Sequence, residues 1–507
     1  MDYMDLKQVI KRRHPEYDDQ LQHWEFLEAT YNGGRAWFDQ NIFRYHKEGA
    51  KEFKDRLERA YRFNHTREIV NLVNKYVFRG EVKRQEDPRP ALAEFWRRAT
   101  RDGRTIRQFM RQADVKASTF GRIWIVVDST LKSEEAVSVA DQKTSGAQTY
   151  VYIVPPTHML DMGYGEDGEL LWCLIYEPIR DDDDPFESTG ETIKRWRIWT
   201  KENWFLIEER KTGTSVDYLI TGQGVNQIGV VPVIPLDALG NHESPYTSPA
   251  LINDIAYLDR AVANYLSNLD AIIQDQTFSQ LAIPAQNLMP GDDDYKKVVE
   301  MGTKRVFVYD GEGGGGPFYL SPDVKQAHLI VDVVSKVINE IYHSVGVAGE
   351  RTKADNSQGI DNSSGVAKAY DFERVNSLLS AKSRSLEQAE NQIAKLVLLF
   401  SGEDVEVSDD FHYVRYPESY DVRGLMDEFA VSEQLALIDA PKTVRREQMR
   451  ALVDKLFPHL KDDLRREIEK ELKNFPSSDV TALPPMRQRQ DQEDDDTSGN
   501  PAQWVAK

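Results

Sequence analysis

Cysteine is almost missing from this sequence of 507 residues, which contains a single one, Cys173. One cysteine cannot form a disulfide bond within the chain, so we expect no covalent cross-link in the fold. Cys173 lies in the apolar run 171–176, and this position predicts a small, buried hydrophobic residue. The sequence also lacks an apolar run of about 18 residues and the basic, then apolar start of a secretory signal. We therefore expect a protein of the cytosol or of a cytosol-like compartment, with no membrane partner.

The motifs of common enzyme chemistry are missing as well. The glycine-rich stretch 311–316 is not followed by the Gly-Lys-Ser/Thr of a phosphate-binding loop and is typical of a flexible hairpin connection. His242-Glu243 lacks the second histidine of a zinc-protease motif, and no Gly-x-Ser-x-Gly nucleophile elbow occurs. Acidic clusters could attract divalent cations, but consecutive carboxylates in such loops are usually only solvated. These clusters lie at 181–184, 292–294 and 491–496. The sequence predicts no catalytic residues, no cofactor and no metal site.

Positive charge is scarce, with 64 Lys and Arg against 84 Asp and Glu, which gives a net charge of −20. Affinity for duplex DNA comes from Lys and Arg side chains that neutralise phosphates, so this balance argues against a surface that grips DNA. It is compatible with a protein that touches DNA without holding it. It is equally compatible with an acidic surface that serves only solubility, so charge alone leaves both interpretations open.

The N-terminal half is expected to change from helices to strands. Apolar residues recur at helical spacing from Phe53 to Phe78 and again from Thr105 to Ala117, and Gly121 is expected to end the second run. The apolar segment 122–128 then predicts a buried strand. Further strands are predicted at 150–154, 170–176, 196–199, 204–207 and 230–234. Together these segments predict a mixed α/β module with a mostly antiparallel sheet.

Long helices are predicted to dominate the second half. Ser248-Pro249 and Ser321-Pro322 each combine an N-capping serine with a proline at the first helical position, and helical apolar stripes follow. Short strands are predicted between these two helices. A polar loop follows, and then a third helix from Ser364 to Phe400 that Gly402 ends. The remaining predictions are a strand at 405–416, a helical segment at 422–475 and a disordered, acidic tail beyond residue 476.

The order of these elements resembles the portal proteins of tailed bacteriophages and herpesviruses, in particular the siphovirus-type head-to-tail connector family. An α/β module leads into a long helix, a small β-rich insertion, a second long helix, a polar loop and a third long helix. Local phrases over about residues 60–400 are similar to that family as well. These phrases are 117–128, 152–156, 228–233, 257–265 and 363–370.

The resemblance implies an α+β portal fold with an α/β wing, long stem helices, a small β-containing clip and a helical crown. By position, the N-terminal helices and wing would occupy 1–247, the stem helices 248–276 and 322–345, and the clip 277–321. The tunnel loop would be 346–365, the long wing helix and return strand 366–420, the crown 421–476 and the disordered acidic tail 477–507.

The resemblance also implies a function and a set of partners. The expected assembly is a homo-oligomeric ring, a dodecamer, at the capsid vertex of a virion that is built in the host cytoplasm. The genome would be packaged and ejected through its channel as double-stranded DNA, without sequence specificity. Expected partners are the major capsid and scaffolding proteins, the terminase large subunit and a head-completion adaptor. A separate terminase ATPase would supply the work, in keeping with the missing phosphate-binding loop.

Within the tunnel loop that the resemblance implies, Arg351 and Lys353 are the only cations, against Glu350, Asp355 and Asp361. If the loop lines the narrowest part of a channel, these two side chains would meet DNA phosphates loosely. Arg351 and Lys353 are therefore the candidate DNA-facing residues. The alternative is an ordinary surface loop whose charges are merely solvated.

Two other functions remain open from the sequence. A non-viral helical scaffold or adaptor would explain the long helices but not the order of the predicted strands. A carboxylate-dependent hydrolase in the α/β module would need an acid/base pair, which the abundant carboxylates do not single out. The mass of the particle separates the first alternative from a ring, and a purified ring without hydrolytic activity would exclude the second.

Overall fold

The computed structural model shows a mixed α+β fold made of two compact units, Met1–Tyr420 and Asp421–Lys507, which we describe separately. The described residues are 6–130, 148–212, 215–240, 244–277, 280–284, 306–309, 316–320, 324–346, 365–403, 405, 411–418, 420, 435, 438, 441–456, 462–473 and 475.

The first unit begins with short helices. They are α1 (Leu6–Val9), α2 (Tyr17–Asn32), α3 (Arg35–Asn41), α4 (Ala50–Arg59), α5 (His65–Val77), α6 (Pro90–Arg97) and α7 (Ile106–Phe120). The helical spacing from Phe53 to Phe78 thus belongs to two helices, α4 and α5, rather than to one. Asn64 accepts a hydrogen bond of 2.9 Å from the backbone N–H of Arg67 and so caps the start of α5.

The helix predicted from Thr105 is confirmed as α7. Thr105 and Gln108 form a reciprocal capping box at its start, and Gly121 follows its end with φ of 89°. Gly121 is also a point of close approach, because a Cβ there would lie 1.8 Å from the backbone oxygen of Ser248. Only glycine satisfies both conditions, so this residue sets the turn from α7 into the next strand.

Two antiparallel sheets form most of the β part of the first unit. The smaller has the order β11-β2-β3, from Val233–Asp237, Arg122–Ser129 and Thr149–Val154. The larger has the order β10-β9-β8-β5-β4, from Ser215–Val225, Asn203–Thr212, Arg195–Thr200, Leu170–Tyr176 and Met159–Tyr164. Every pairing between these described strands is antiparallel, as the sequence predicted. Cys173 on β5 is fully buried, which confirms its expected role as a small core residue.

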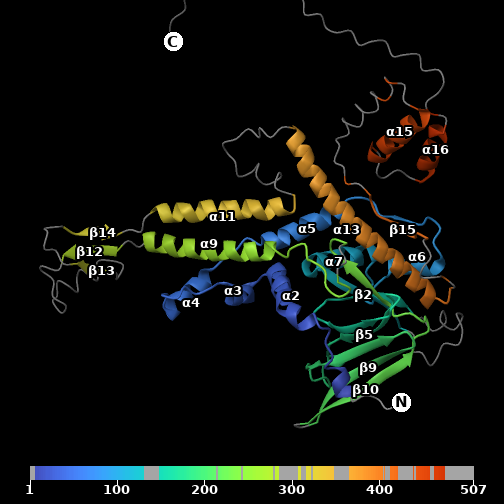
Figure 1. Cartoon of the computed structure of the whole chain (residues 1–507), viewed down its shortest axis with the longest axis horizontal. Helices are drawn as coiled ribbons and strands as arrows, with labels where there is room; N and C mark the ends of the chain where they lie inside the picture. Colours follow the sequence, from blue (N-terminus) through green and yellow to red (C-terminus); the bar gives the residue numbers. More distant parts are fainter. Residues whose placement is uncertain are drawn as a thin grey trace, which may run out of the picture. The chain divides into compact units, whose positions relative to one another are not determined.

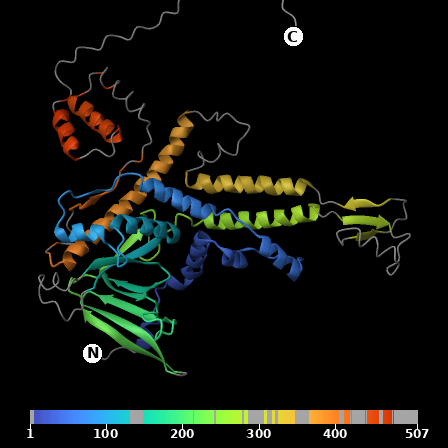
Figure 2. The same ribbon diagram turned by 180° about the vertical axis from the view of Figure 1, so that it is seen from behind.

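The smaller sheet lies between helices and the larger sheet (Figure 1, Figure 2). In the central strand β2, every residue from Arg122 to Asp128 is buried, so both faces of the strand are covered. Helix α7 and the long helix α13 (Gly365–Phe400) pack on β2 and β11. The continuous apolar run at 122–128 is explained by this two-sided burial.

Two details of the predicted strands were wrong. The strand expected at 230–234 is β11 at Val233–Asp237, where Pro235 lies opposite Trp124 of β2. Strands β4 and β10 were not predicted. β4 contains Asp161 and Gly163, residue types that are depleted in strands, and β10 is an edge strand whose apolar side chains are partly exposed.

Two long helices, α9 (Ile255–Thr277) and α11 (Val324–Ser344), lie side by side (Figure 1, Figure 2). The predicted start of the first helix at Ser248-Pro249 was wrong, because α9 begins at Ile255. Leu251 is buried and donates its backbone N–H to the carbonyl oxygen of Ser118 on α7, at 3.1 Å. That contact holds the chain in turns before the helix can begin.

Short strands follow at the end of the helical pair. β12 (Gln280–Pro284) pairs antiparallel with β14 (Phe318–Leu320) and parallel with β13 (Val306–Tyr309). Short strands were predicted in this part of the chain, and the described strands confirm them.

The third long helix is confirmed as α13, and Gly402 follows its end with φ of 73°. Only a small part of the strand expected at 405–416 is a described strand, β15 (Val414–Arg415), which pairs with β1 (Lys83–Arg84). The side-chain amide oxygen of Asn391 on α13 accepts hydrogen bonds from the backbone N–H groups of Tyr413 (2.7 Å) and Val414 (3.1 Å).

The second unit contains α15 (Lys442–Leu456) and α16 (Asp462–Leu472), so the described residues within 422–475 are mostly helical, as the sequence predicted. Arg446 donates a hydrogen bond of 3.3 Å to the carbonyl oxygen of Phe475. The predicted acidic tail, 477–507, lies outside the described residues.

Candidate assembly surfaces: a paired-helix arm and a pocket between the sheets

Helices α9 and α11 form a structure that we call the paired-helix arm. Their 23 and 21 residues correspond to lengths of about 34 and 31 Å, at about 1.5 Å per residue. We call 255–267 with 334–344 the base of the arm, and 268–277 with 324–333 its outer part. The chain runs out along α9, passes the strands β12–β14 and returns along α11.

Three arginines spaced three residues apart fasten helix α9 to the N-terminal part of the chain. Arg56 donates hydrogen bonds of 2.8 Å to Glu48 and to the hydroxyl of Ser267 on α9. Arg59 lies 3.1 Å from Asp270, in an exposed ion pair. Arg62 lies 3.6 Å from Asp259, and only 4% and 0% of these two side chains is exposed.

The contact between Arg62 and Asp259 is the most deeply buried of the three. The Asp259 carboxylate also accepts hydrogen bonds from the backbone N–H (3.2 Å) and the hydroxyl (2.8 Å) of Thr66. The Arg62 guanidinium lies 3.9 Å from the centre of the Trp37 ring. Burial lowers the pKa of Arg62, and the negative charge of Asp259 opposes that effect. The pair therefore joins α9 to the segment between α4 and α5 in a region shielded from solvent.

Helix α11 is held at the same end by α5. The Tyr342 hydroxyl lies 3.1 Å from Nδ1 of His65 and donates a hydrogen bond of 2.7 Å to Glu68. Ile341 and Tyr342 are buried, as are Ile255, Val262 and Leu266 on α9. The base of the arm is thus part of the hydrophobic core of the first unit.

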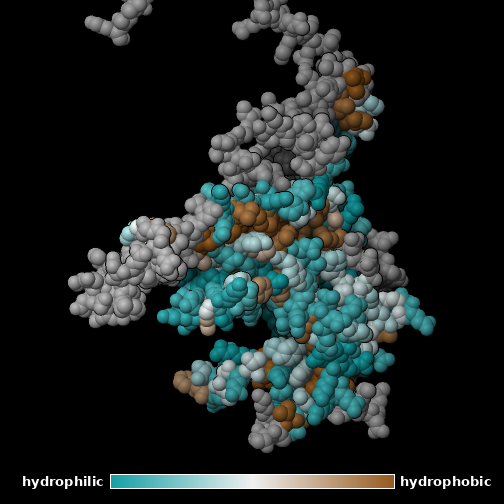
Figure 3. All heavy atoms as spheres, turned by 60° about the vertical axis from the view of Figure 1, so that its left-hand side comes forward, coloured by the Kyte–Doolittle hydropathy of each residue, from teal (hydrophilic) through white to brown (hydrophobic). Residues whose placement is uncertain are grey.

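The outer part of the arm is different, because its apolar side chains are exposed. Among the described side chains, none of α9 after Ser267 and none of α11 before Val334 is buried. Leu329 is 63% exposed, Ile273 47% and Val331 45%. Figure 3 shows hydrophobic side chains gathered along this pair of helices. Leu329 and Val331 are two positions apart and so point to different sides of α11, which makes the apolar surface wider than α9 alone can cover.

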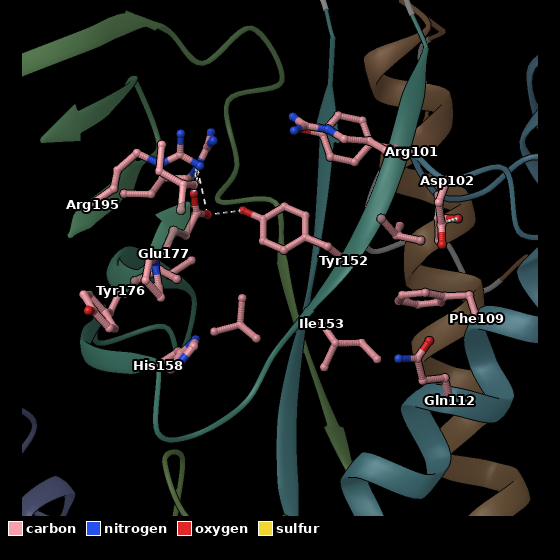
Figure 4. Close-up of a pocket in the computed structure, with 18 residues that line it drawn as sticks. Arg101, Asp102, Phe109, Gln112, Tyr152, Ile153, His158, Tyr176, Glu177 and Arg195 are labelled. Carbon is pink, nitrogen blue, oxygen red and sulfur yellow. Dashed lines mark hydrogen bonds and ion pairs between the residues drawn. The ribbon is translucent and has the colours of Figure 1, made fainter. Parts of the chain in front are cut away.

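A pocket of about 530 Å³ lies between the two sheets beside α7 (Figure 4). Figure 4 shows Tyr152 of β3 pointing toward Glu177, while Ile153 points toward Phe109 and Gln112 of α7. The pocket is therefore formed along the edge of β3, with the larger sheet on one side and α7 on the other. Its volume is in the range of sites for small molecules or short peptide segments.

A network of buried charges forms the wall of this pocket on the side of the larger sheet. Arg197 lies 3.0 Å from Glu177 and 3.2 Å from Asp128, which joins the two sheets. Tyr150 and Tyr152 donate hydrogen bonds of 2.7 Å to Asp128 and Glu177 respectively. Burial alone would lower the pKa of Arg197, but Tyr152, Glu177 and Asp128 together raise it. Burial and the neighbouring acids also raise the pKa of both tyrosines, so their hydroxyls stay neutral.

At the rim of the pocket, arginines are partly accessible. Arg101 is exposed, contacts the Tyr150 hydroxyl and lies 4.1 Å from the centre of the Tyr150 ring. Arg195 lies 3.4 Å from Glu177. Burial lowers the pKa of His158, which therefore favours its neutral form. The arrangement combines an apolar interior with a charged rim, in which Arg195 is paired with Glu177 while Arg101 contacts only Tyr150 among the described residues.

The predicted DNA-facing residues Arg351 and Lys353 lie outside the described residues, as does most of the predicted tunnel loop. The sequence analysis did not identify Arg56, Arg59 and Arg62 as the fastening of the arm. Their spacing of three residues was visible in the sequence. Their partners on α9 were not, because Ser267 follows Arg56, and Asp270 follows Arg59, by 211 residues in the sequence.

In the described part of the chain, no group of three His, Cys, Asp or Glu is placed to hold a metal ion. None of the described helices is long and apolar enough to cross a membrane.

Comparison with known proteins finds similarity among solved structures but not among protein families or curated sequences. No protein family and no curated protein matches the sequence. Among solved structures, the chain is similar to one from the neck of an empty gene transfer agent particle computed with C6 symmetry. The sequence identity is 12% and the TM-score 0.37, over 75% of this chain and 90% of that one. It is also similar to a chain from the virion of a native gene transfer agent particle, with 12% identity and a TM-score of 0.36, over 74% and 90%. Likenesses of this degree assign no function.

Proposed function

We propose that this chain is a structural subunit of a tailed-phage-like particle, and specifically its portal protein. In this proposal, copies of the chain form a ring at the capsid vertex, and double-stranded DNA passes through the ring during packaging and ejection. The observation that carries the proposal is the outer part of the paired-helix arm. It exposes apolar side chains on more than one side, although it belongs to two regular, well-formed helices.

A ring explains this surface in physical terms. Apolar surface that one copy leaves exposed is stabilised when other copies cover it, and helices pack closely by fitting ridges into grooves. Repeating the arm around an axis would place Leu329 and Val331 against the neighbouring arms and would build a stiff channel wall. A head-to-tail contact that closes on itself forms a ring rather than a filament.

The charge of the chain suits contact with DNA without tight binding. A net charge of −20 per copy repels phosphates, so DNA would meet few points of strong attachment. We assign 346–365 to the tunnel loop and Arg351 and Lys353 to loose phosphate contacts within it. We also propose that the strands β12–β14 belong to the clip, where the terminase large subunit and the head-completion adaptor dock, because short strand edges can pair with a partner.

The mass of the purified protein tests the proposal. We expect a closed ring, a dodecamer, at physiological salt by mass photometry, and a ring with a central channel in negative-stain electron micrographs. A stable monomer or dimer would contradict the proposal, and an open or branched assembly would favour a non-viral scaffold. Replacing Arg351 and Lys353 with Ala should leave the ring intact and change DNA packaging or retention. Normal packaging by that variant would remove these two residues from the DNA contact.

A further inference from the structure

A second feature of the first unit has no evident role in folding. The two-stranded hairpin of β6 (Ile179–Arg180) and β7 (Thr192–Ile193) carries four consecutive aspartates at 181–184, followed by Pro185 and Phe186. The Phe186 residue is 96% exposed, more than any other large hydrophobic residue in the described part of the chain. We call 179–193 the acidic hairpin.

Phe186 lies in a loop that is held by hydrogen bonds between its own residues. A carboxylate oxygen of Asp184 accepts a hydrogen bond of 2.8 Å from the Phe186 N–H, and the Asp184 N–H donates one of 3.0 Å to the Ser188 hydroxyl. The Asp181 carboxylate accepts hydrogen bonds from the backbone N–H (2.9 Å) and the hydroxyl (2.7 Å) of Thr189. These hydrogen bonds lower the pKa of Asp181. The loop therefore presents a phenyl ring and several carboxylates in a fixed arrangement, which reduces the entropy lost on binding.

The pocket between the sheets has the complementary properties. Its interior includes the apolar side chains of Phe109, Ile153 and Pro178, and Arg101 and Arg195 lie at its rim. Arg101 is a cation without a carboxylate partner among the contacts of the described chain, since its contacts are with Tyr150. Asp102 and Glu177 also line the pocket, but Asp102 is paired with Arg104 and Glu177 with Arg195 and Arg197, so Arg101 is the cation open to an acidic segment. An acidic segment with one aromatic side chain would match both this charge and the interior of the pocket.

The edge of β3 adds backbone groups to the pocket. Among the described strands, only β2 pairs with β3. Val127 of β2 donates its N–H to Pro232, away from β3, and its opposite residue Val151 donates to Ala99, away from β2. Because antiparallel pairs alternate, the N–H and C=O of Ile153 also point away from β2. They are available to an extended segment that enters the pocket.

We propose that the acidic hairpin of one copy of this chain occupies the pocket of a second copy, with Phe186 inside and the aspartates against Arg101 and Arg195. Within one copy, Phe186 is almost fully exposed and does not fill the pocket. Ile179 at the base of the hairpin lines the pocket, so the two adjoin on each copy, and the contact builds a ring when each copy inserts its hairpin into the next copy. The proposal rests on the proposed ring, for which it supplies a contact outside the paired-helix arm.

Cross-linking between two single-cysteine variants tests the contact directly. Glu187→Cys subunits, which keep Phe186, and Gln112→Cys subunits are mixed, assembled and treated with a short bismaleimide. The native Cys173 is 0% exposed, so it does not compete for the reagent. We expect cross-linked dimers in the mixture, well above the yield of either variant alone. The matched control mixes Gln112→Cys with Glu166→Cys, which places the second thiol on an exposed loop outside the hairpin.

The same samples distinguish the two proposals. A ring of normal mass in which the mixture cross-links no more than the control overturns the hairpin–pocket contact and leaves the portal proposal standing. Cross-linked dimers without a ring would support the contact and contradict the portal proposal. Absence of any association would overturn both.

Substitutions provide a second test that does not depend on the reagent. Phe186→Ala should fold normally, because the side chain contributes nothing to the core, and it should weaken association about tenfold or more. Arg101→Glu should weaken association as well, and combining it with Asp183→Arg should restore part of the loss. Unchanged association of the Phe186→Ala variant, measured by mass photometry over a dilution series, would overturn the proposal.

Discussion

The base and the outer part of the paired-helix arm belong to the same two helices but have opposite surroundings. At the base, Asp259 is fully buried and paired with Arg62, and Tyr342 bonds to Glu68 of α5. In the outer part, Leu329 and Val331 are exposed. The base packs into the hydrophobic core of its own copy of the chain, whereas the outer part exposes apolar surface that another copy could cover. The comparison teaches that one pair of helices can serve folding at one end and assembly at the other.

The largest effect on folding is expected from Arg62→Ala at the base. The substitution leaves the Asp259 carboxylate buried without its cation, which should lower the free energy of unfolding by about 3–5 kcal/mol. Denaturation followed by tryptophan fluorescence measures it, with Trp37 lying next to the lost guanidinium. The control is Arg59→Ala, whose ion pair with Asp270 is exposed and should contribute only about 0–1 kcal/mol. Equal losses in the two variants would show that burial does not distinguish these contacts.

A thiol in the core should be alkylated much more slowly than a thiol on the outer part of the arm. Burial raises the pKa of Cys173 from 9.0 to about 12, which lowers the reactive thiolate fraction. At pH 8 that fraction falls about 1000-fold, and burial slows access further. In a Val331→Cys variant, we expect rapid alkylation of the new thiol before assembly, slow alkylation after assembly and almost none at Cys173. Mass spectrometry of timed samples gives the rates. Rapid labelling of Cys173 in the folded protein would contradict the burial of β5.

A charge placed on the outer part of the arm should affect assembly and leave folding nearly unchanged. Leu329→Asp puts a carboxylate on apolar surface that neighbouring copies are proposed to cover, and we expect association weakened about 10–100-fold. The far-ultraviolet circular dichroism spectrum should match that of the unaltered protein. Lys336→Ser, at an exposed polar position of α11, is the control and should assemble normally. Normal assembly of Leu329→Asp would place the interface elsewhere.

The smallest effect is a pH dependence at the base of the arm. The hydrogen bond from Arg56 lowers the pKa of Glu48 below its usual value of 4.5. A carboxyl group with a lowered pKa in the folded state stabilises the fold above the unfolded-state value, and this stabilisation is lost as the pH falls through the folded-state pKa. The unaltered protein should therefore be more stable than Glu48→Gln at pH 6, and the difference should shrink below about pH 4.5. Thermal unfolding of both proteins from pH 6 to pH 3 measures it, and a constant difference would contradict the role of the Glu48 charge.

Several elements could be predicted from the sequence because their signals are local. The apolar spacing and the end at Gly402 identified α13, Thr105 and Gly121 delimited α7, and the unbroken apolar run at 122–128 identified β2. Each of these signals depends on neighbours within a few turns of the same helix or on one strand. The exposed apolar stripe of α11 also follows from its sequence, since its spacing is wider than one partner helix requires.

The candidate site was less accessible to prediction. Arg351 and Lys353 remain a prediction from resemblance, because they lie outside the described residues. The acidic run at 181–184 was visible in the sequence, but its internal hydrogen bonds and the full exposure of Phe186 were not. The pocket needed the two sheets and α7 to be placed together, and strands β3 and β5 that line it do not pair with each other.

The sequence by itself determined the kind and order of most elements, and the tertiary structure decided where they begin, what they cover and how they are joined. Leu251 shows the first point, because its contact with Ser118 delays the start of α9 despite a good capping sequence at Ser248-Pro249. Lys382 shows the second. A lysine is usually solvated, yet Lys382 lies three residues after Leu379 on the apolar face of α13, is 1% exposed and lies 2.8 Å from the buried Asp114 of α7. The physical reason is that helix and strand patterns depend on near neighbours, whereas a buried charge is tolerated only where the fold brings a distant partner to it.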